Sequence, residues 1–374
     1  MFRCMTRNRP LLQWLRLLGL GLALSGSCVM AAGCAGAERE ELTAGIRGQA
    51  HRIRDASLPV EQVPSRFFSP SSIWNETIPR RARLDRRSAR LVAKLAAEVA
   101  AEQLVEQGPS INTTKWSVPI YTVPSDQPTV RVGLESNSFY PALQSAWDAV
   151  PLPPNAQPAA GTDRHLVVWQ PSTDRLWEFW RLSQTASGGW SAAWGGAMRN
   201  VSLSSGVYGS EAWPGASARW GASASSLSIA GGLITLEDLA LGQINHALAM
   251  SIPDVRAGVY SSPARRDDGT SFTPLSLPEG AHLRLNPRLD LAALHLPPLT
   301  LMLAYAAQRY GIFVRDGGAN VAFYAQDPTP TGTNPYLGPA GYFEGASPHA
   351  LLAAFPWRRL QVLKMDLHRY QSRG

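Results

Sequence analysis

The spacing of apolar positions along the chain predicts many short strands and few helices. Residues 84–107 repeat their apolar side chains with the period of a helix, and Gly108 follows as a helix stop. The stripe that this helix would bury consists of Leu91, Val92, Leu95 and Val99. Residues 298–310 form a second apolar helical segment, and residues 235–241 form a single helical turn before Gly242.

Alternation between apolar and polar residues predicts the strands. The clearest hairpin joins residues 165–170 to residues 175–181 across the four-residue turn 171–174. A second hairpin is expected between residues 312–315 and 321–326, around an Asp-Gly-Gly turn. Further strands are expected at residues 118–132, 243–250 and 281–286.

These elements indicate a mainly β fold. Short strands, frequent turn signals and only two convincing helices favour an antiparallel β-sandwich of the jelly-roll type, with two or three peripheral helices. Residues 65–374 are expected to form this single domain, which begins with the N-terminal helix. The chain contains neither a phosphate-binding loop nor a dinucleotide fingerprint, so we expect no cofactor.

The first 34 residues have the order of a signal for export. Four arginines precede a short apolar run at residues 17–24, and small residues follow up to Cys34. We expect Cys34 to carry a lipid that anchors an exported protein at the cell surface or in the periplasm. Cleavage near residues 35–37, which would release a freely secreted protein, is the alternative. Residues 35–64 are polar and are expected to form a flexible tether.

Cysteine usage and charge narrow the classes of protein further. All three cysteines lie in the signal, so the domain has neither a disulfide nor a cysteine-based metal site. The formal charge of +7 falls to +3 once the four arginines of the signal are removed, and no nucleic-acid motif is present. No later apolar run is long enough to cross a membrane. We therefore expect no nucleic-acid partner, and membrane contact only through the lipid.

The predicted hairpin places an imidazole beside a carboxylate. If Gln170 pairs with Arg175, His165 lies opposite Trp180, and Glu178 is its diagonal neighbour at about 7–8 Å. The other face of the hairpin is strongly apolar, so we expect His165 and Glu178 on a solvent-filled face. A carboxylate beside a histidine raises its pKa and fixes its tautomer, which suits catalysis near neutral pH. The alternative is a cross-strand pair on a wetted sheet face.

Asp163 shares this face but lies too far from Glu178 for glycoside hydrolysis. Strand geometry separates the two carboxylates by about 14 Å, whereas the reaction needs about 5–9.5 Å. We therefore expect Asp163 to bind substrate. A hydrolase would need another carboxylate, for which Glu211 is the best candidate, whereas a lyase needs only a base and an arginine. Asp163 and His165 are too few for a metal site, and we expect none.

Three further polar side chains are candidates for the same site. His246 lies among apolar residues and is expected to be either a second acid or base or a buried core histidine. Arg265 precedes an Asp-Asp-Gly turn, where it would either grip a uronate carboxylate or lie solvated on the surface. Arg284 alternates with leucines, so we expect its side chain to point away from the core and to bind substrate.

Tryptophans are concentrated in the middle of the chain. Seven of the twelve lie within 52 residues: Trp169, Trp177, Trp180, Trp190, Trp194, Trp213 and Trp220. We expect Trp177 in the core. The indoles of Trp180, Trp194 and Trp213 are expected to line a groove, because flat apolar faces beside polar groups suit sugar rings.

Several short motifs are spread over residues 65–330. They are Ser72-Ile73-Trp74-Asn75, Gly161-Thr-Asp-Arg-His165, Glu178-Phe-Trp180, Asn245-His-Ala-Leu248, Pro263-Ala-Arg265, Gly280-Ala-His-Leu-Arg-Leu285 and Tyr310-Gly311. In this combination the chain resembles a family of exported single-domain proteins from soil bacteria. The resemblance implies export and a single domain, and it assigns no catalytic residue. In fold alone, the chain is similar to concanavalin-like jelly rolls, many of which bind or cleave polysaccharides.

These features predict an exported carbohydrate-active protein. We expect it to degrade an extracellular polysaccharide in a tryptophan-lined groove, as a glycoside hydrolase or a polysaccharide lyase. In this hypothesis His165 is the acid or base, Glu178 orients it or acts as a catalytic carboxylate, and His246 is a weaker catalytic candidate. The alternatives are a carbohydrate-binding surface lipoprotein without catalysis and a structural surface protein.

Overall fold

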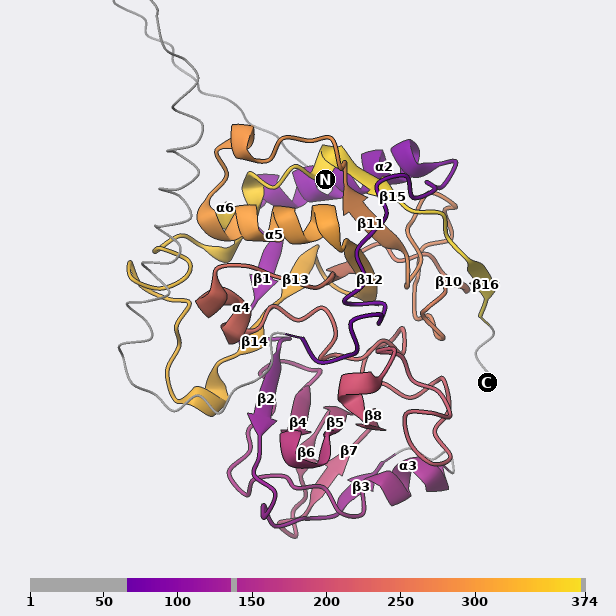
Figure 1. The fold of residues 1–374 in the computed structure, drawn as a ribbon, viewed down its shortest axis with the longest axis vertical. Coiled ribbons are helices and arrows are strands. Elements are labelled where there is room, and N and C mark those ends of the chain that lie inside the picture. The colour runs from indigo at the N-terminus through magenta and orange to yellow at the C-terminus, as the bar shows by residue number, and fades with distance from the viewer. Residues whose placement is uncertain (1–65, 136–139, 371–374) are drawn as a thin grey trace, which may run out of the picture.

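The computed structural model describes residues 66–135 and 140–370, which form mixed β-sheets with few helices (Figure 1). The expected signal, the tether and Cys34 lie outside this range. The α-helices are α2 (Ser88–Leu104), α3 (Pro141–Ala146), α4 (Leu236–Leu241), α5 (Pro298–Arg309) and α6 (Pro348–Ala353). None of the helices in the described part of the chain is long and apolar enough to span a membrane.

The largest sheet has six strands in the order β1-β13-β9-β12-β11-β15. Its strands are β1 (Ser110–Asn112), β13 (Ala322–Tyr324), β9 (Leu248–Ile252), β12 (Ile312–Gly317), β11 (His282–Leu285) and β15 (Leu360–Val362). Strands β1 and β13 are parallel, as are β9 and β12, and the other neighbours are antiparallel. Helices α2, α5 and α6 lie around this sheet in the upper part of Figure 1.

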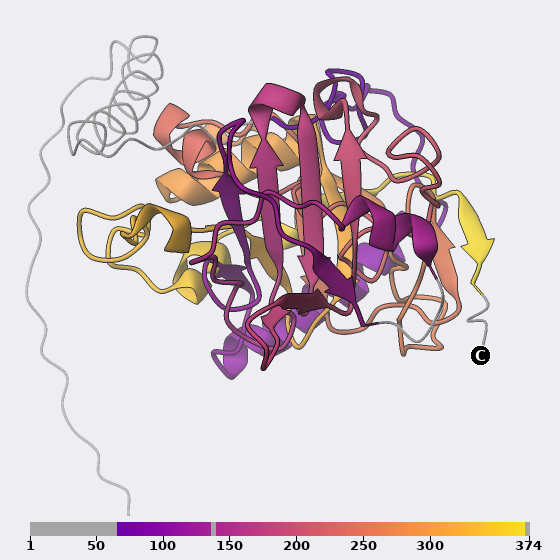
Figure 2. The same ribbon diagram turned by 90° about the horizontal axis from the view of Figure 1, so that it is seen from below.

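A five-stranded sheet forms the lower part of the molecule, with the order β14-β2-β4-β5-β8 (Figure 1). Its strands are β14 (Gln326–Asp327), β2 (Val118–Thr122), β4 (Leu166–Gln170), β5 (Arg175–Trp180) and β8 (Trp194–Arg199). Seen from below, the long strands lie side by side (Figure 2). Two smaller sheets contain β3 (Val132–Leu134), β7 (Trp190–Ala192) and β6 (Ser183–Gln184), and β10 (Val259–Ser261) with β16 (Leu367–Arg369).

The sheets are mixed, which corrects the expected all-antiparallel order. Five of the twelve strand pairs in the described residues are parallel: β1–β13, β9–β12, β14–β2, β2–β4 and β3–β7. Parallel neighbours need long connections, and here those connections bring together strands that are far apart in the sequence. Alternation within one strand does not reveal this pairing.

The hairpin β4–β5 has the predicted register. Gln170 pairs with Arg175, and Val167 pairs with Glu178. The turn between the strands is a single 3-10 turn closed by Asp174, whose φ of 51° is left-handed. The geometry that places His165 and Glu178 on one face is therefore confirmed.

The second predicted hairpin, within residues 312–326, is wrong. β12 and β13 do not pair with each other, because β9 lies between them. All five residues of β9 are buried, and alternate ones belong to different apolar cores: Leu248, Met250 and Ile252 to one, and Ala249 to the other. A strand that is apolar on both faces is most stable in the interior of a sheet, where both edges are paired.

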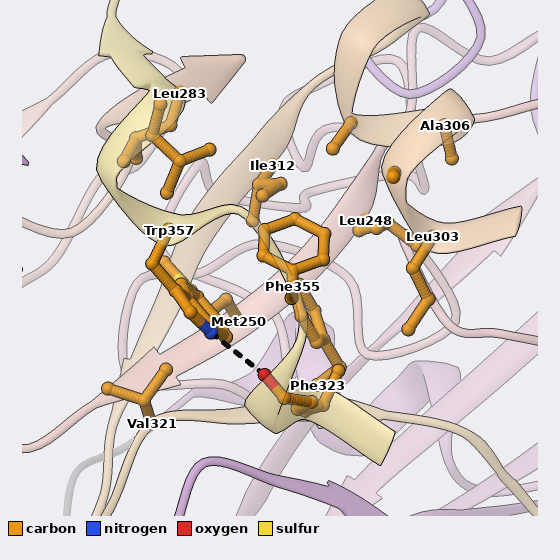
Figure 3. Packing of buried hydrophobic residues seen from close by; sticks show 14 of the residues in the cluster. Leu248, Met250, Leu283, Leu303, Ala306, Ile312, Val321, Phe323, Phe355 and Trp357 are labelled. Atoms are coloured by element: carbon orange, nitrogen blue, oxygen red, sulfur yellow. Dashed lines mark hydrogen bonds between the residues drawn. The ribbon is translucent and has the colours of Figure 1, made fainter. Parts of the chain in front are cut away.

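The described residues form two apolar cores, and the six-stranded sheet contributes to both. The predicted stripe of α2 is buried in the core above the six-stranded sheet, although the helix ends at Leu104 and Gly108 is not its stop. Figure 3 shows the centre of this core, where Phe323, Phe355 and Trp357 pack with ring centroids 4.7–5.9 Å apart. The other core fills the space around the five-stranded sheet and reaches Phe313 on the six-stranded sheet. Both faces of the hairpin β4–β5 are consequently covered.

Candidate functional site

The face that carries His165 and Glu178 is buried, which corrects the expected solvent-filled groove. Glu178 has no exposed surface, and His165 is 3% exposed. Both side chains contact the same residue of the covering loop: Glu178 Oε1 accepts from the Ala222 amide at 2.7 Å, and His165 Nε2 lies 3.1 Å from the Ala222 carbonyl oxygen. The loop covers the two side chains, so they do not face substrate.

Glu178 acts as an anchor for the loop of residues 222–229. Its Oε2 accepts from the Ser228 hydroxyl at 2.7 Å and from the Ile229 amide at 3.0 Å. Burial raises the pKa of Glu178, while the hydrogen bonds from Ser228, Ala222 and Ile229 lower it. A carboxylate with three such donors is a structural group, and the prediction of a catalytic role is not supported.

His165 is held as a neutral side chain. Burial lowers its pKa to about 4, the charge of Asp163 raises it, and the charge of Arg315 lowers it further. Its Nδ1 is buried and has no hydrogen-bond partner among the described residues. A catalytic base needs access to substrate as well as a suitable pKa, and His165 lacks that access here.

His246 is a buried core histidine, which is one of the two alternatives that the sequence left open. Its Nε2 lies 3.0 Å from Asp238 Oδ2, and its Nδ1 lies 2.8 Å from the Ala247 carbonyl oxygen. Burial alone would lower the pKa of His246, but the charge and hydrogen bond of Asp238 outweigh it and raise the pKa. Asp238 also accepts from Thr235 at the start of α4. His246 therefore stabilises a helix terminus.

Neither of the two arginines predicted to bind substrate lines the surface hollow at Trp180. Arg284 is buried, and its guanidinium donates to Gln361 Oε1 and to the carbonyl oxygens of Pro79 and Arg80. Its side chain leaves β11 on the face opposite Leu283 and Leu285, which belong to the core, but the guanidinium ties the segment before α2 to β11 and β15. Arg265 has a buried Nε without a partner among the described residues and does not reach the Trp180 surface described next.

A surface hollow of about 510 Å³ lies at the end of the hairpin β4–β5 and contains two of the predicted binding residues, Asp163 and Trp180. We call it the Trp180 hollow. It is lined by Glu135, Thr162, Asp163, Arg164, Trp180, Arg181 and Ser183. The half-buried indole of Trp180 donates to Asp163 Oδ1 at 3.3 Å, and the Arg181 guanidinium lies 5.4 Å from the Trp180 ring centroid. The hollow thus combines an aromatic face with groups of both charges.

Two arginines of the Trp180 hollow have left-handed backbones. The φ angles are 45° for Arg164 and 55° for Arg181, a conformation that costs a residue with a side chain about 1 kcal/mol. Two backbone hydrogen bonds hold it: the Arg181 amide donates to the Asp163 carbonyl at 2.6 Å, and the Leu182 amide donates to the Arg164 carbonyl at 3.2 Å. Both arginines line the hollow.

The other predicted tryptophans do not line the hollow. Trp194 pairs with Trp180 across β5 and β8, but its indole donates to the Arg219 carbonyl oxygen and packs edge-on against Tyr140. Trp213 packs against Trp177, with ring centroids 6.0 Å apart, at the margin of the core. Glu211, predicted as a second carboxylate, is exposed and does not line the hollow.

Sequence reasoning missed a second group of polar side chains. Asp268, Glu279 and Asp316 each place a carboxylate oxygen within 4.8 Å of the other two. They come from a loop, from the residues just before β11, and from β12 next to a register shift after Val314. They are too far apart along the chain to form a motif, and only the pairing of β11 with β12 brings two of them together.

Burial and mutual repulsion disfavour ionisation of the carboxyls in this cluster. Burial raises the pKa of Glu279 well above its usual range, and the charges of Asp316 and Asp268 raise it further. Burial and the charge of Asp268 raise the pKa of Asp316 to about 7, although Arg315 lowers it. The charge of Asp163 also raises the pKa of Asp316.

No protein-family model matches this chain, and no curated protein or solved structure shows significant similarity to it.

Proposed function

We propose that this protein binds a carbohydrate, part of an extracellular polysaccharide, in the Trp180 hollow. The observation that carries the proposal is the composition of the hollow, in which Trp180 lies beside Arg164, Arg181 and Asp163. Sugar rings stack their C–H faces on indoles while their hydroxyls hydrogen-bond to charged and polar groups. The volume of about 510 Å³ falls within the usual range for small-ligand sites, about 300–1,000 Å³.

The arginines favour an acidic sugar. A guanidinium donates two parallel hydrogen bonds to a carboxylate, and both Arg164 and Arg181 are exposed at the hollow. Glu135 and Asp163 would accept from hydroxyls of the same ligand. A uronic acid within a polysaccharide matches this set of donors and acceptors.

We favour binding over cleavage. His165 and Glu178, which the sequence predicted as a catalytic pair, are buried under the loop of residues 222–229 and hydrogen-bonded to it. For the fold, we propose that the two large sheets form a sandwich. We do not propose a jelly roll, because parallel strand pairs interrupt the strand order of that fold. The protein would be exported and anchored through Cys34, with the hollow directed at glycans outside the cell.

The test is retention of the full chain on immobilised acidic and neutral polysaccharides. Trp180→Ala should weaken binding about tenfold, because loss of one stacking face costs about 1–1.5 kcal/mol. Arg181→Gly should also weaken binding to acidic glycans, and glycine readily adopts the left-handed backbone at this position. Tyr305→Ala, which removes an exposed aromatic side chain from α5, is the matched control.

Retention that is equal in all variants would contradict the proposal, as would no retention on any glycan. Reducing ends and the absorbance of unsaturated uronates are measured in the same samples. Release of either product by the wild type would show that the protein cleaves its ligand and would overturn our preference for binding.

A further inference from the structure

Three carboxylates from separate parts of the chain meet at one end of the six-stranded sheet. Oxygens of Asp268, Glu279 and Asp316 lie within 4.8 Å of one another. Asp268 is exposed, Asp316 is half-buried and Glu279 is fully buried. The cluster therefore extends from the surface into the interior.

Glu279 distinguishes this cluster from an ordinary acidic patch. It has no exposed surface, and neither of its carboxylate oxygens has a hydrogen-bond partner among the described residues. A buried carboxylate without a donor or a counter-charge is strongly unfavourable, so such groups are normally paired or bound to a metal. Its neighbours in the cluster, Asp316 and Asp268, are also acceptors when ionised.

The nearby arginines do not neutralise the cluster by direct contact. Arg266 donates to the Ser226 hydroxyl and to the carbonyl oxygens of Gly221 and Ser223. Arg315 Nη1 donates to the Ile229 and Gly231 carbonyl oxygens. Within residues 66–135 and 140–370, no salt bridge involves any of the three carboxylates.

We propose that Asp268, Glu279 and Asp316 bind a divalent cation of the size of Ca²⁺. Calcium takes carboxylate oxygens at about 2.3–2.6 Å, so two of its ligand atoms can be as far apart as about 4.6–5.2 Å. Oxygens that lie within 4.8 Å of one another can therefore bind one such ion. Calcium accepts irregular sets of carboxylate oxygens, whereas magnesium requires a near-octahedral shell at about 2.0–2.1 Å and usually keeps several waters. Exposed Asp268 gives the ion a route from solvent to Glu279.

This inference does not depend on the Trp180 hollow or on any sugar. The competing explanation is a proton shared between Glu279 and Asp268, which would also relieve the repulsion between the two carboxylates. Cation binding predicts that calcium stabilises the protein, whereas proton sharing predicts no response to calcium, so one experiment separates them.

The experiment measures the melting temperature of the full chain at pH 7.5, after chelation and then with added Ca²⁺ or Mg²⁺. Ca²⁺ at 1 mM should raise the melting temperature of the wild type by several degrees, because a ligand that binds only the folded state stabilises it. Mg²⁺ should have a smaller effect. Tb³⁺, a luminescent ion of similar size, should bind and be displaced by Ca²⁺.

Glu279→Gln and Asp268→Asn should abolish the calcium response and the displaceable Tb³⁺ signal. Asp126→Asn, which changes an exposed carboxylate elsewhere, should keep both. If Glu279→Gln does not fold, Asp268→Asn still carries the test because Asp268 is exposed.

Two results would overturn the proposal. A wild type that does not respond to Ca²⁺ at 10 mM, with no displaceable Tb³⁺ signal, would leave a shared proton as the explanation. A calcium response that persists in Glu279→Gln and Asp268→Asn would place the bound ion elsewhere. Equal responses to Mg²⁺ and Ca²⁺ would overturn the size assignment.

Discussion

Among single residues, Glu178 shows most clearly how a polar side chain can organise a fold. The alternation of β5 predicts its face and its cross-strand partner, and both predictions are confirmed. The strand pattern contains no sign of the loop that covers this face, because residues 222–229 come from a segment rich in serine and alanine. The burial of Glu178 could therefore not be predicted without the tertiary structure.

Replacement of Glu178 should unfold the loop that it holds. In Glu178→Gln, one carboxylate oxygen becomes an NH₂ donor that faces amide or hydroxyl donors. We expect a loss of about 2–4 kcal/mol in the free energy of unfolding, measured with urea. Glu211→Gln, at an exposed glutamate, should change stability by less than about 0.5 kcal/mol. Wild-type stability in Glu178→Gln would show that these hydrogen bonds contribute little.

The buried His165 should make stability dependent on pH. Its pKa is lowered to about 4 by burial, whereas a histidine in an unfolded chain titrates near 6.5. As the pH falls below 6.5, the unfolded state takes up a proton that the folded state takes up only near pH 4. This group should therefore remove about 3 kcal/mol of stability between pH 6.5 and 4.

Urea unfolding of His165→Gln across this pH range checks the expectation. The variant keeps a donor for the Ala222 carbonyl and should show a shallower loss of stability in acid than the wild type. His368→Gln, at an exposed histidine, should follow the wild-type curve. Parallel curves for His165→Gln and the wild type would mean that His165 is accessible to protons in the folded state.

At the scale of elements, the sequence patterns correctly predicted those features that depend on residues close together in the chain. The apolar stripe of α2, the helices α4 and α5, and the register of β4–β5 were all correct. The prediction of a hairpin within residues 312–326 was wrong, because strand pairing depends on which other strands compete for the same edge. The carboxylate cluster was missed for the same reason, since its members meet only after β11 and β12 pair.

The start of α4 allows a test of how much helix capping contributes to the stability of the folded protein. Thr235 and Asp238 form a reciprocal capping box, and Asp238 also bonds to His246. Thr235→Ala should cost about 1–2 kcal/mol in urea unfolding. Ser347→Ala removes a single hydrogen bond at the start of α6 and should cost less. Equal costs would indicate that the capping box contributes no more than one cap.

At the scale of the whole molecule, the sequence predicted a β-rich domain with a small number of helices, but not the connection between the two cores. β9 contributes to both cores from its two faces, so the six-stranded sheet lies between them. The Trp180 hollow could be predicted in part, because Asp163 and Trp180 lie at one end of a hairpin with a clear register. Glu135 could not, since it belongs to another segment of the chain, next to β3.

The proposed lipid anchor leads to a prediction about Cys34. If residues 1–34 direct export and lipid attachment, the wild type should be recovered with membranes, and Cys34→Ser should be recovered in the soluble fraction. Cell fractionation followed by immunoblotting measures this. A wild type that is soluble from the start would favour cleavage near residues 35–37 and secretion.

The position of β1 at the edge of the six-stranded sheet has a consequence for how the protein is made. β1 ends at Asn112, and its partner β13 begins at Ala322, so more than half of the described chain separates two neighbours in one sheet. A ribosome or translocon releases residue 112 long before residue 322. The edge of β1 that pairs with β13 therefore stays unpaired until residue 322 has emerged. A product truncated before residue 322 would lack this partner altogether.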